Sequence, residues 1–214
     1  MSQKILIILF IFLHCQVILA SDPDPVQDFC IAHEAESGLN LQCKNSSLAT
    51  VEDFVFSGVK SPGKFSETGL SATSVNSKIF PGLNTLGMSF VRADLEPGGI
   101  NPPHFHPRAT EIVFVLEGKV YSGFVDTQNR VFSRVIEKGE VMVFPRGLLH
   151  FQMNVGYERA TILGSFDSQN PGLQRIANAV FGSGIEEGLL EKAFGLSPKE
   201  LAKLRRKFAS EHKE

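Results

Sequence analysis

The chain has 214 residues and a formal net charge of −2 at pH 7. This length is enough for one domain with a well-buried core, and a weakly acidic chain has no general electrostatic attraction for nucleic acid. The basic cluster Arg205, Arg206 and Lys207 lies beside acidic residues near the C-terminus, and we interpret it as a solvated helix face.

The first predicted element is a secretory signal peptide over residues 1–20. Lys4 supplies a positive charge, Ile5–Leu13 is an unbroken apolar run, and Ala20 is a small residue suited to cleavage. A membrane anchor is the alternative, but the run is shorter than the roughly 20 residues that cross a bilayer. No later segment is long and apolar enough to span, so we expect residues 21–214 to form a single secreted domain without a membrane span.

Cleavage would remove Cys15 and leave one pair of cysteines, Cys30 and Cys43. In an exported chain such a pair most simply forms one disulfide, and its short loop gives a stabilisation of roughly 3 kcal/mol in the chain-entropy model. A free thiol pair or a metal site is the alternative. A sequon follows, which predicts an N-linked glycan on Asn45.

Short runs rich in Val, Ile and Phe, separated by turn residues, predict β-strands in the middle of the chain. The expected strands are Thr85–Leu95, Glu111–Leu116, Val120–Val125, Val131–Ile136, Val141–Phe144, Leu149–Asn154 and Ala160–Phe166. Strands at this regular spacing favour an all-β sandwich or barrel.

After Pro171 the apolar periodicity becomes helical. We expect one helix over Ile185–Phe194, ended by Gly195. The sequence Ser197-Pro198-Lys199-Glu200 is a capping box with proline at the first helical position, and it predicts the start of a second helix. Both helices are amphipathic, so they can cover a barrel end or a neighbouring subunit.

His104 and His106 are the sharpest local signal for chemistry. Residues i and i+2 of a strand point to the same face, so the two imidazoles converge. Glu111 opens the next strand, and we expect a hairpin to bring its carboxylate back beside them; on an apolar face a carboxylate needs a partner or a metal. With His150, the group suits a divalent transition metal that keeps open positions for water or substrate. An ordinary surface pair is the alternative interpretation of the first two histidines.

The spacing of these residues resembles two sequence boxes of the plant germin-like proteins, a family of the cupin superfamily. The boxes are Gly98-x5-His104-x-His106-x4-Glu111-x6-Gly118 and Gly139-x5-Pro145-x-Gly147-x2-His150-x3-Asn154. The resemblance covers essentially the whole chain after the signal peptide. It implies a cupin jelly-roll β-barrel with C-terminal α-helices and one Mn²⁺ per subunit on His104, His106, Glu111 and His150. It also implies a hexamer built as a trimer of dimers, glycosylation, and residence in the plant apoplast or cell wall.

Family membership does not fix the reaction, because its members include oxalate oxidases, superoxide dismutases and proteins without known activity. Oxalate-oxidising members resemble this chain at Asn101 but have a second asparagine at the position of Val91, where valine offers no donor. Gln152, on the face of His150, is an amide that can compensate. The other role open to Asn101 is to start the turn into Pro102.

We therefore prefer an extracellular manganese oxidoreductase that dismutates superoxide to hydrogen peroxide, with a role in defence and little or no oxalate oxidase activity. The alternative is a non-catalytic wall protein, or a ligand-binding protein related to the auxin-binding cupins.

Overall fold

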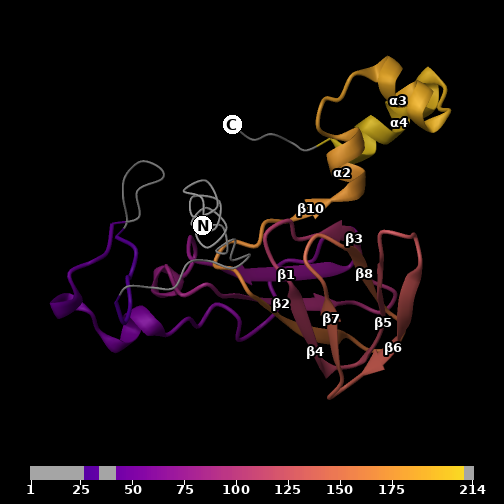
Figure 1. Ribbon diagram of the computed structural model, residues 1–214. Coiled ribbons are helices and arrows are strands. Elements are labelled where there is room, and N and C mark those ends of the chain that lie inside the picture. The colour runs from indigo at the N-terminus through magenta and orange to yellow at the C-terminus, as the bar shows by residue number, and fades with distance from the viewer. Residues whose placement is uncertain (1–26, 34–41, 210–214) are drawn as a thin grey trace, which may run out of the picture.

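The computed structural model describes residues 27–33 and 42–209, so the expected signal peptide lies outside the described residues (Figure 1). Two five-stranded antiparallel sheets form a β-barrel. The first sheet has the order β1 (Leu70–Val75), β2 (Ser89–Leu95), β9 (Ala160–Phe166), β4 (Glu111–Glu117) and β7 (Val141–Phe144). The second has the order β10 (Gln174–Arg175), β3 (Ile100–Phe105), β8 (Leu149–Asn154), β5 (Lys119–Val125) and β6 (Val131–Glu137).

The core lies between the two sheets and follows from alternation along the strands. In β4, Val113 and Val115 are fully buried, whereas Ile112 and Phe114 face outward. Successive strand residues point to opposite faces, so each strand supplies one apolar row to the interior. The other members of the core cluster are Leu70, Ala93, Leu95, Val120, Ile136, Phe144, Ala160 and Ile162.

The predicted all-β fold with C-terminal helices is confirmed, and six of the seven expected strands lie within one residue of their observed bounds. The seventh was expected to begin at Thr85 but begins at Ser89. Thr85 has a φ of 65°, a left-handed conformation that belongs to a turn and not to a strand. Strands β1, β3 and β10 were not among the seven expected strands.

Three helices follow the barrel and stand away from it beyond β10 (Figure 1). They are α2 (Ile176–Phe181), which was not predicted, α3 (Glu187–Phe194) and α4 (Pro198–Phe208). Helix α3 begins two residues later than expected, because the Glu186 carboxylate caps it by accepting from the N–H groups of Gly188 and Leu189. The capping box of α4 is present as predicted. Within the described part of the chain, no helix combines the length and apolar character needed to cross a membrane.

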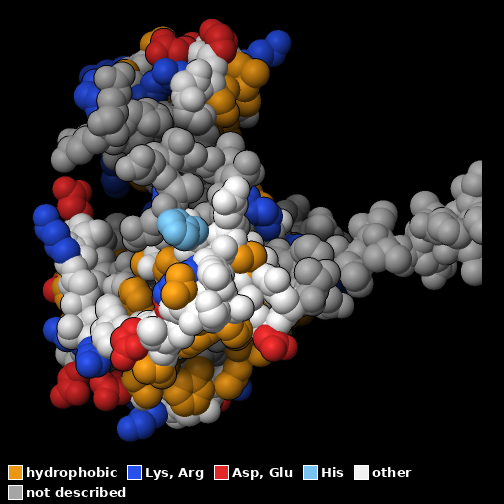
Figure 2. Space-filling model, turned by 90° about the vertical axis from the view of Figure 1, so that its left-hand side faces the viewer, with side chains coloured by type: hydrophobic (Ala, Val, Ile, Leu, Met, Phe, Trp, Pro, Cys, Tyr) orange, Lys and Arg blue, Asp and Glu red, His pale blue; other side chains and the backbone are white. Residues whose placement is uncertain are grey.

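The segment before β1 carries two short 3₁₀ helices, η1 (Ser46–Leu48) and η2 (Val51–Phe54), and a third, η3 (Pro81–Leu83), lies between β1 and β2. Cys30 and Cys43 form a disulfide, as predicted, and Lys44 forms an ion pair with Asp53 at 2.8 Å. Figure 2 views the molecule from the side where this segment lies in Figure 1, and it shows hydrophobic side chains at the surface among charged ones.

Candidate metal centre

The four predicted ligands come from both sheets. His104 lies near the end of β3, His106 follows that strand, and His150 lies in the neighbouring β8, whereas Glu111 begins β4 of the other sheet. The expected hairpin between the histidines and Glu111 is therefore wrong. Both edges of β3 are occupied by β10 and β8, and both edges of β4 by β9 and β7, so the short connection after Pro107 crosses from one sheet to the other.

The local sequence of β3 explains how His104 reaches the interior. The pairing of β3 with β8 shifts register between Asn101 and His104, where Pro102 and Pro103 have no N–H to donate to the ladder. After the shift, His104 lies directly opposite His150. Asn101 is a strand residue, so its interpretation as the start of a turn is wrong.

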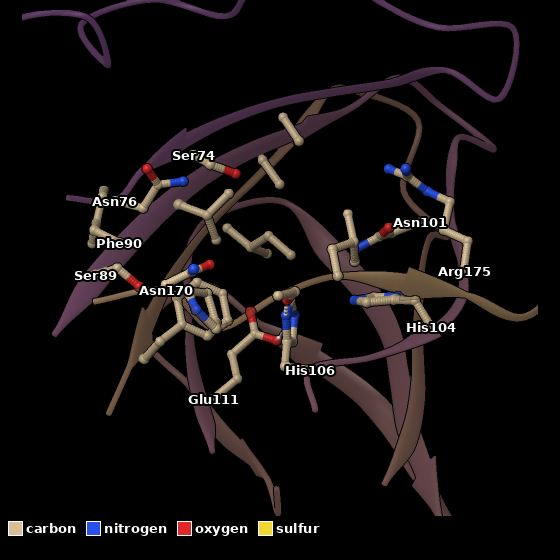
Figure 3. A pocket seen from close by; sticks show the side chains of 18 residues that line it. Ser74, Asn76, Ser89, Phe90, Asn101, His104, His106, Glu111, Asn170 and Arg175 are labelled. Carbon is tan, nitrogen blue, oxygen red and sulfur yellow. Dashed lines mark hydrogen bonds and ion pairs between the residues drawn. The ribbon is translucent and has the colours of Figure 1, made fainter. Parts of the chain in front are cut away.

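The four side chains form one compact and buried group. Their potential ligand atoms all lie within 4.8 Å of one another, and the side chains of His106 and Glu111 point toward one another in Figure 3. Glu111 Oε2 lies 3.1 Å from His150 Nε2 and 3.4 Å from His106 Nε2. The four residues expose only 1–7% of their surface.

Backbone carbonyl groups fix the orientation of all three imidazoles. The Nδ1 atoms of His104 and His150 lie 2.8 Å from the carbonyl oxygens of Pro102 and Leu148, and His106 Nδ1 contacts the Gly172 carbonyl. A carbonyl oxygen only accepts hydrogen bonds, so each Nδ1 carries a hydrogen, and each Nε2 faces the site, where it can offer a lone pair to a metal ion. This arrangement is typical of metal-binding histidines.

Three imidazole Nε2 atoms and a carboxylate thus converge in one buried group. Such a set is favourable only around a metal ion or an added proton, and its composition suits a divalent transition metal. The structure thus contains a metal-binding group at the residues expected from the sequence.

Burial and mutual contacts set the charges of the group. Burial, together with the neighbouring His150, lowers the pKa of His104 to about 3, so the imidazole is neutral at physiological pH. Burial alone would raise the pKa of Glu111, but hydrogen bonds with His106 and His150 outweigh it and lower the pKa to about 2. The site therefore offers a neutral imidazole at His104 and an ionised carboxylate at Glu111, the protonation states that bind a metal.

Gly164 in β9 is a residue of the site that the sequence reasoning missed. A Cβ atom at this position would lie 2.5 Å from Glu111 Oε1 and 2.7 Å from Val91 Cγ1, both closer than real contacts allow. Only glycine leaves room for the carboxylate in its observed position. The available signal was a glycine inside an apolar strand, which often marks a close approach.

A cavity of about 210 Å³ opens beside the metal group, lined by residues that include His104, His106 and Glu111 (Figure 3). Val91 lines this cavity, as does Asn101, whose amide donates to Gln152 Oε1 at 2.7 Å. Gln152 shares the buried face of His150, as predicted, but it is not part of the cavity lining. Val91 and Asn101 therefore line the cavity, whereas Gln152 lies outside its lining and contacts it through the hydrogen bond with Asn101.

Comparison with a protein-family model defines the general class of this protein. The cupin family model matches residues 57–202, a span that holds both sheets and the metal group. The fold and the site together define a metal-binding cupin.

Individual relatives narrow the class. Germin-like protein subfamily 3 member 2 of Arabidopsis thaliana is 60% identical over 197 residues, which are 89% of this chain and 87% of the relative. Germin-like protein 2-4 of Oryza sativa subsp. japonica is 51% identical and covers 96% of this chain and 94% of its own length. The solved structure of oxalate oxidase in complex with the substrate analogue glycolate has a TM-score of 0.85 at 40% identity, covering 88% of this chain and 98% of that one. This chain belongs to the germin family of the cupin superfamily.

Proposed function

We propose that this chain is a manganese-dependent oxidoreductase that dismutates superoxide, so that two superoxide ions and two protons give dioxygen and hydrogen peroxide. The observation that carries the proposal is the convergence of three imidazole Nε2 atoms and one carboxylate beside a cavity. Bound manganese would supply the one-electron redox chemistry. A diatomic substrate needs little beyond access to that ion.

The chain's own residues would hold and shield the ion. Imidazoles bind a metal in their neutral form, and the ionised Glu111 contributes one negative charge, so a bound divalent ion would keep a net positive charge that attracts an anion. Phe166, whose ring lies 4.6 Å from that of His106, and Ile162 form part of the apolar wall, which limits the water in contact with the site.

Oxalate oxidation would require hydrogen-bond donors in the same cavity to orient the substrate. The related oxalate oxidase accepts the small carboxylate glycolate, and in this chain Val91 offers no hydrogen-bond donor. The Asn101 amide already donates to Gln152. A charged oxygen left against Val91 would cost about 1–3 kcal/mol or more, which is about tenfold or more in rate. We therefore propose that oxalate oxidase activity is low.

The test of both activities uses manganese-loaded protein from a eukaryotic secretion host. Wild-type protein should dismutate superoxide and release little peroxide from oxalate, whereas Val91→Asn should raise oxalate-dependent peroxide release at least about tenfold. Val51→Asn, at an exposed position of the N-terminal segment where it creates no glycosylation sequon, is the matched control and should change neither activity. Manganese-loaded wild type without dismutase activity would refute the proposal, and robust oxalate turnover would refute its negative part.

The proposal includes secretion to the plant apoplast or cell wall, cleavage after residue 20, and a glycan at Asn45. Asn45 is exposed, and its side-chain oxygen accepts from the Ser47 hydroxyl at 2.9 Å, so the sequon is open to solvent in the folded chain. Mass spectrometry of the secreted protein should find an N-terminus near residue 21 and deamidation of Asn45 after enzymatic deglycosylation. An unmodified Asn45 in protein secreted from a plant host would contradict the glycan.

Two exposed apolar surfaces support a homo-oligomer, which we propose to be a hexamer formed as a trimer of dimers. On the outer face of β4 and β7, Ile112 pairs with Val143 and Phe114 with Val141, and all four are exposed. The C-terminal helices, which stand away from the barrel, expose further apolar residues such as Leu189. Large exposed apolar patches mark interaction sites. Light scattering at micromolar concentration should give about six times the monomer mass, and a monomer would contradict the proposal.

A second candidate function is the binding of a small organic ligand without catalysis. The observation that favours it is the cavity, whose volume of about 210 Å³ exceeds what a diatomic substrate needs. Fully manganese-loaded protein that binds a ligand but lacks dismutase activity would support this candidate over the first.

A further inference from the structure

We infer that Arg175 is a specificity-determining residue that holds the carboxylate of a small organic anion in the cavity beside the metal group. This inference rests on one part of the proposed function, namely that a metal ion is bound beside the same cavity. It assigns a substrate or ligand class to that cavity, namely a monocarboxylate with a short apolar body.

The pairing of β10 with β3 determines where Arg175 lies. The two strands are antiparallel, and Arg175 is the residue directly opposite His104. Directly opposite residues project from the same face of a sheet. The arginine side chain is therefore on the face of the metal group, and it lines the cavity. In Figure 3 it lies beside Asn101, on the same side of the cavity as His104.

The guanidinium group has no partner among the residues that the structure describes. No hydrogen bond, ion pair or ring contact engages it, although the residue is half-buried. Other arginines of the chain are engaged, as Arg92 is by Asp94 and Arg108 by Asn170. A half-buried cation without a partner has lost part of its hydration without compensation. A carboxylate is the ligand that fits, because the planar guanidinium offers parallel N–H donors to its two oxygens.

The rest of the cavity limits what can accompany that carboxylate. Glu111 also lines the cavity, but His106 and His150 engage its carboxylate, so it does not neutralise the arginine. The walls include apolar side chains such as Val91 and Ile162. A ligand in about 210 Å³ therefore carries one carboxylate and a body of a few carbon atoms. Oxalate differs, because its second carboxylate would face the apolar wall without a donor.

Calorimetric titration of the oligomeric, manganese-loaded protein tests this assignment with n-butyrate and its neutral analogue butyramide. The two probes have nearly the same shape and differ in charge. Wild type should bind butyrate more tightly than butyramide. Arg175→Gln should weaken butyrate binding at least about tenfold and abolish the preference, because a charge-assisted bidentate contact is lost. Arg175→Lys should give an intermediate affinity, since it keeps the charge without the fork.

Arg130→Gln is the matched control, because this arginine is exposed and pairs with Asp126 at the turn between β5 and β6. Its butyrate affinity should equal that of wild type. Unchanged butyrate binding in Arg175→Gln would overturn the inference. If Arg175→Gln does not fold, an unchanged preference for butyrate in Arg175→Lys would overturn it.

Repeating the titrations on metal-free protein and measuring dismutase activity in parallel separates this inference from the proposed function. A butyrate preference that needs the metal and is unaffected by the Arg175 substitutions would assign the carboxylate to the ion alone and overturn the inference. Arg175-dependent butyrate binding in a protein without dismutase activity would uphold the inference and reject the proposed reaction. Arg175→Gln protein that dissociates from its oligomer while binding butyrate normally would assign the arginine to an interface and also overturn it.

Discussion

Gly164→Ala should detach the carboxylate ligand from the metal group while leaving the fold largely intact. The added Cβ would lie 2.5 Å from Glu111 Oε1 and 2.7 Å from Val91 Cγ1. The backbone of β9 accommodates alanine, so the conflict is steric. The clash with Val91 can relax within the core at a cost of about 1–3 kcal/mol. The clash with Glu111 can relax only by moving its carboxylate away from the histidines.

We expect the metal affinity of Gly164→Ala to fall about 10- to 100-fold, the range typical of losing a group that orients a ligand. Competition with a chromogenic chelator measures the affinity, and denaturant unfolding of the metal-free protein measures the fold separately. The metal-free variant should lose no more than about 1–3 kcal/mol.

Gly123→Ala is the matched control for this experiment. It lies inside β5, and its Cβ would meet Ser133 Cβ at 2.4 Å and the Phe132 carbonyl oxygen at 2.7 Å, neither of which belongs to a metal ligand. This variant should lose stability of similar or greater size but keep wild-type metal affinity. Wild-type metal affinity in Gly164→Ala, or an equal loss of affinity in Gly123→Ala, would refute the steric role assigned to Gly164.

The remaining predictions use simpler changes. His106→Ala should reduce manganese occupancy at least about tenfold by elemental analysis; full occupancy with unchanged thermal stability would exclude His106 as a ligand. Cys30 and Cys43 should be resistant to alkylation in the unreduced secreted protein, and their reduction should lower the free energy of unfolding by about 3 kcal/mol; two alkylatable thiols before reduction would contradict the disulfide. In metal-free protein, the free energy of unfolding should fall as the pH decreases from about 6.5 towards about 3. The unfolded His104 takes up a proton in that window and the folded one does not, which gives a slope of up to about 1.4 kcal/mol per pH unit. A denaturant midpoint that is constant between about pH 7.5 and about pH 5.5 would contradict this.

The ligand set could be predicted from the sequence because each of its residues has a local cause. The spacing of His104 and His106, the charge of Glu111 on an apolar strand, and the turn before His150 are all visible without the fold. Which sheet each strand joins is not visible, because neighbours along the chain can lie in different sheets. The expected hairpin failed for that reason, since the chain crosses between the sheets after Pro107.

Other parts of the site depend on contacts far apart in the sequence. Gly164 matters because β9 lies beside β4 at that position, opposite Val113. Arg175 faces the cavity because a strand of two residues pairs with β3 opposite His104. A strand that short has no hydrophobic period to detect, so no local pattern could have assigned this arginine to the metal cavity.

Because the ligands come from both sheets, metal binding and folding are linked in this chain. Glu111 begins β4 of one sheet, whereas His104 and His150 belong to strands of the other. Without a metal ion, three imidazoles and a carboxylate are buried with only one another as partners inside the site, which disfavours the closed barrel. A bound ion would replace this unfavourable burial with favourable contacts between the metal and its ligands, and it would hold the two sheets together. At a free metal concentration of 100 times the dissociation constant, the linkage contributes about 2.7 kcal/mol to folding. The four metal ligands are therefore also the residues through which a bound ion would stabilise the barrel.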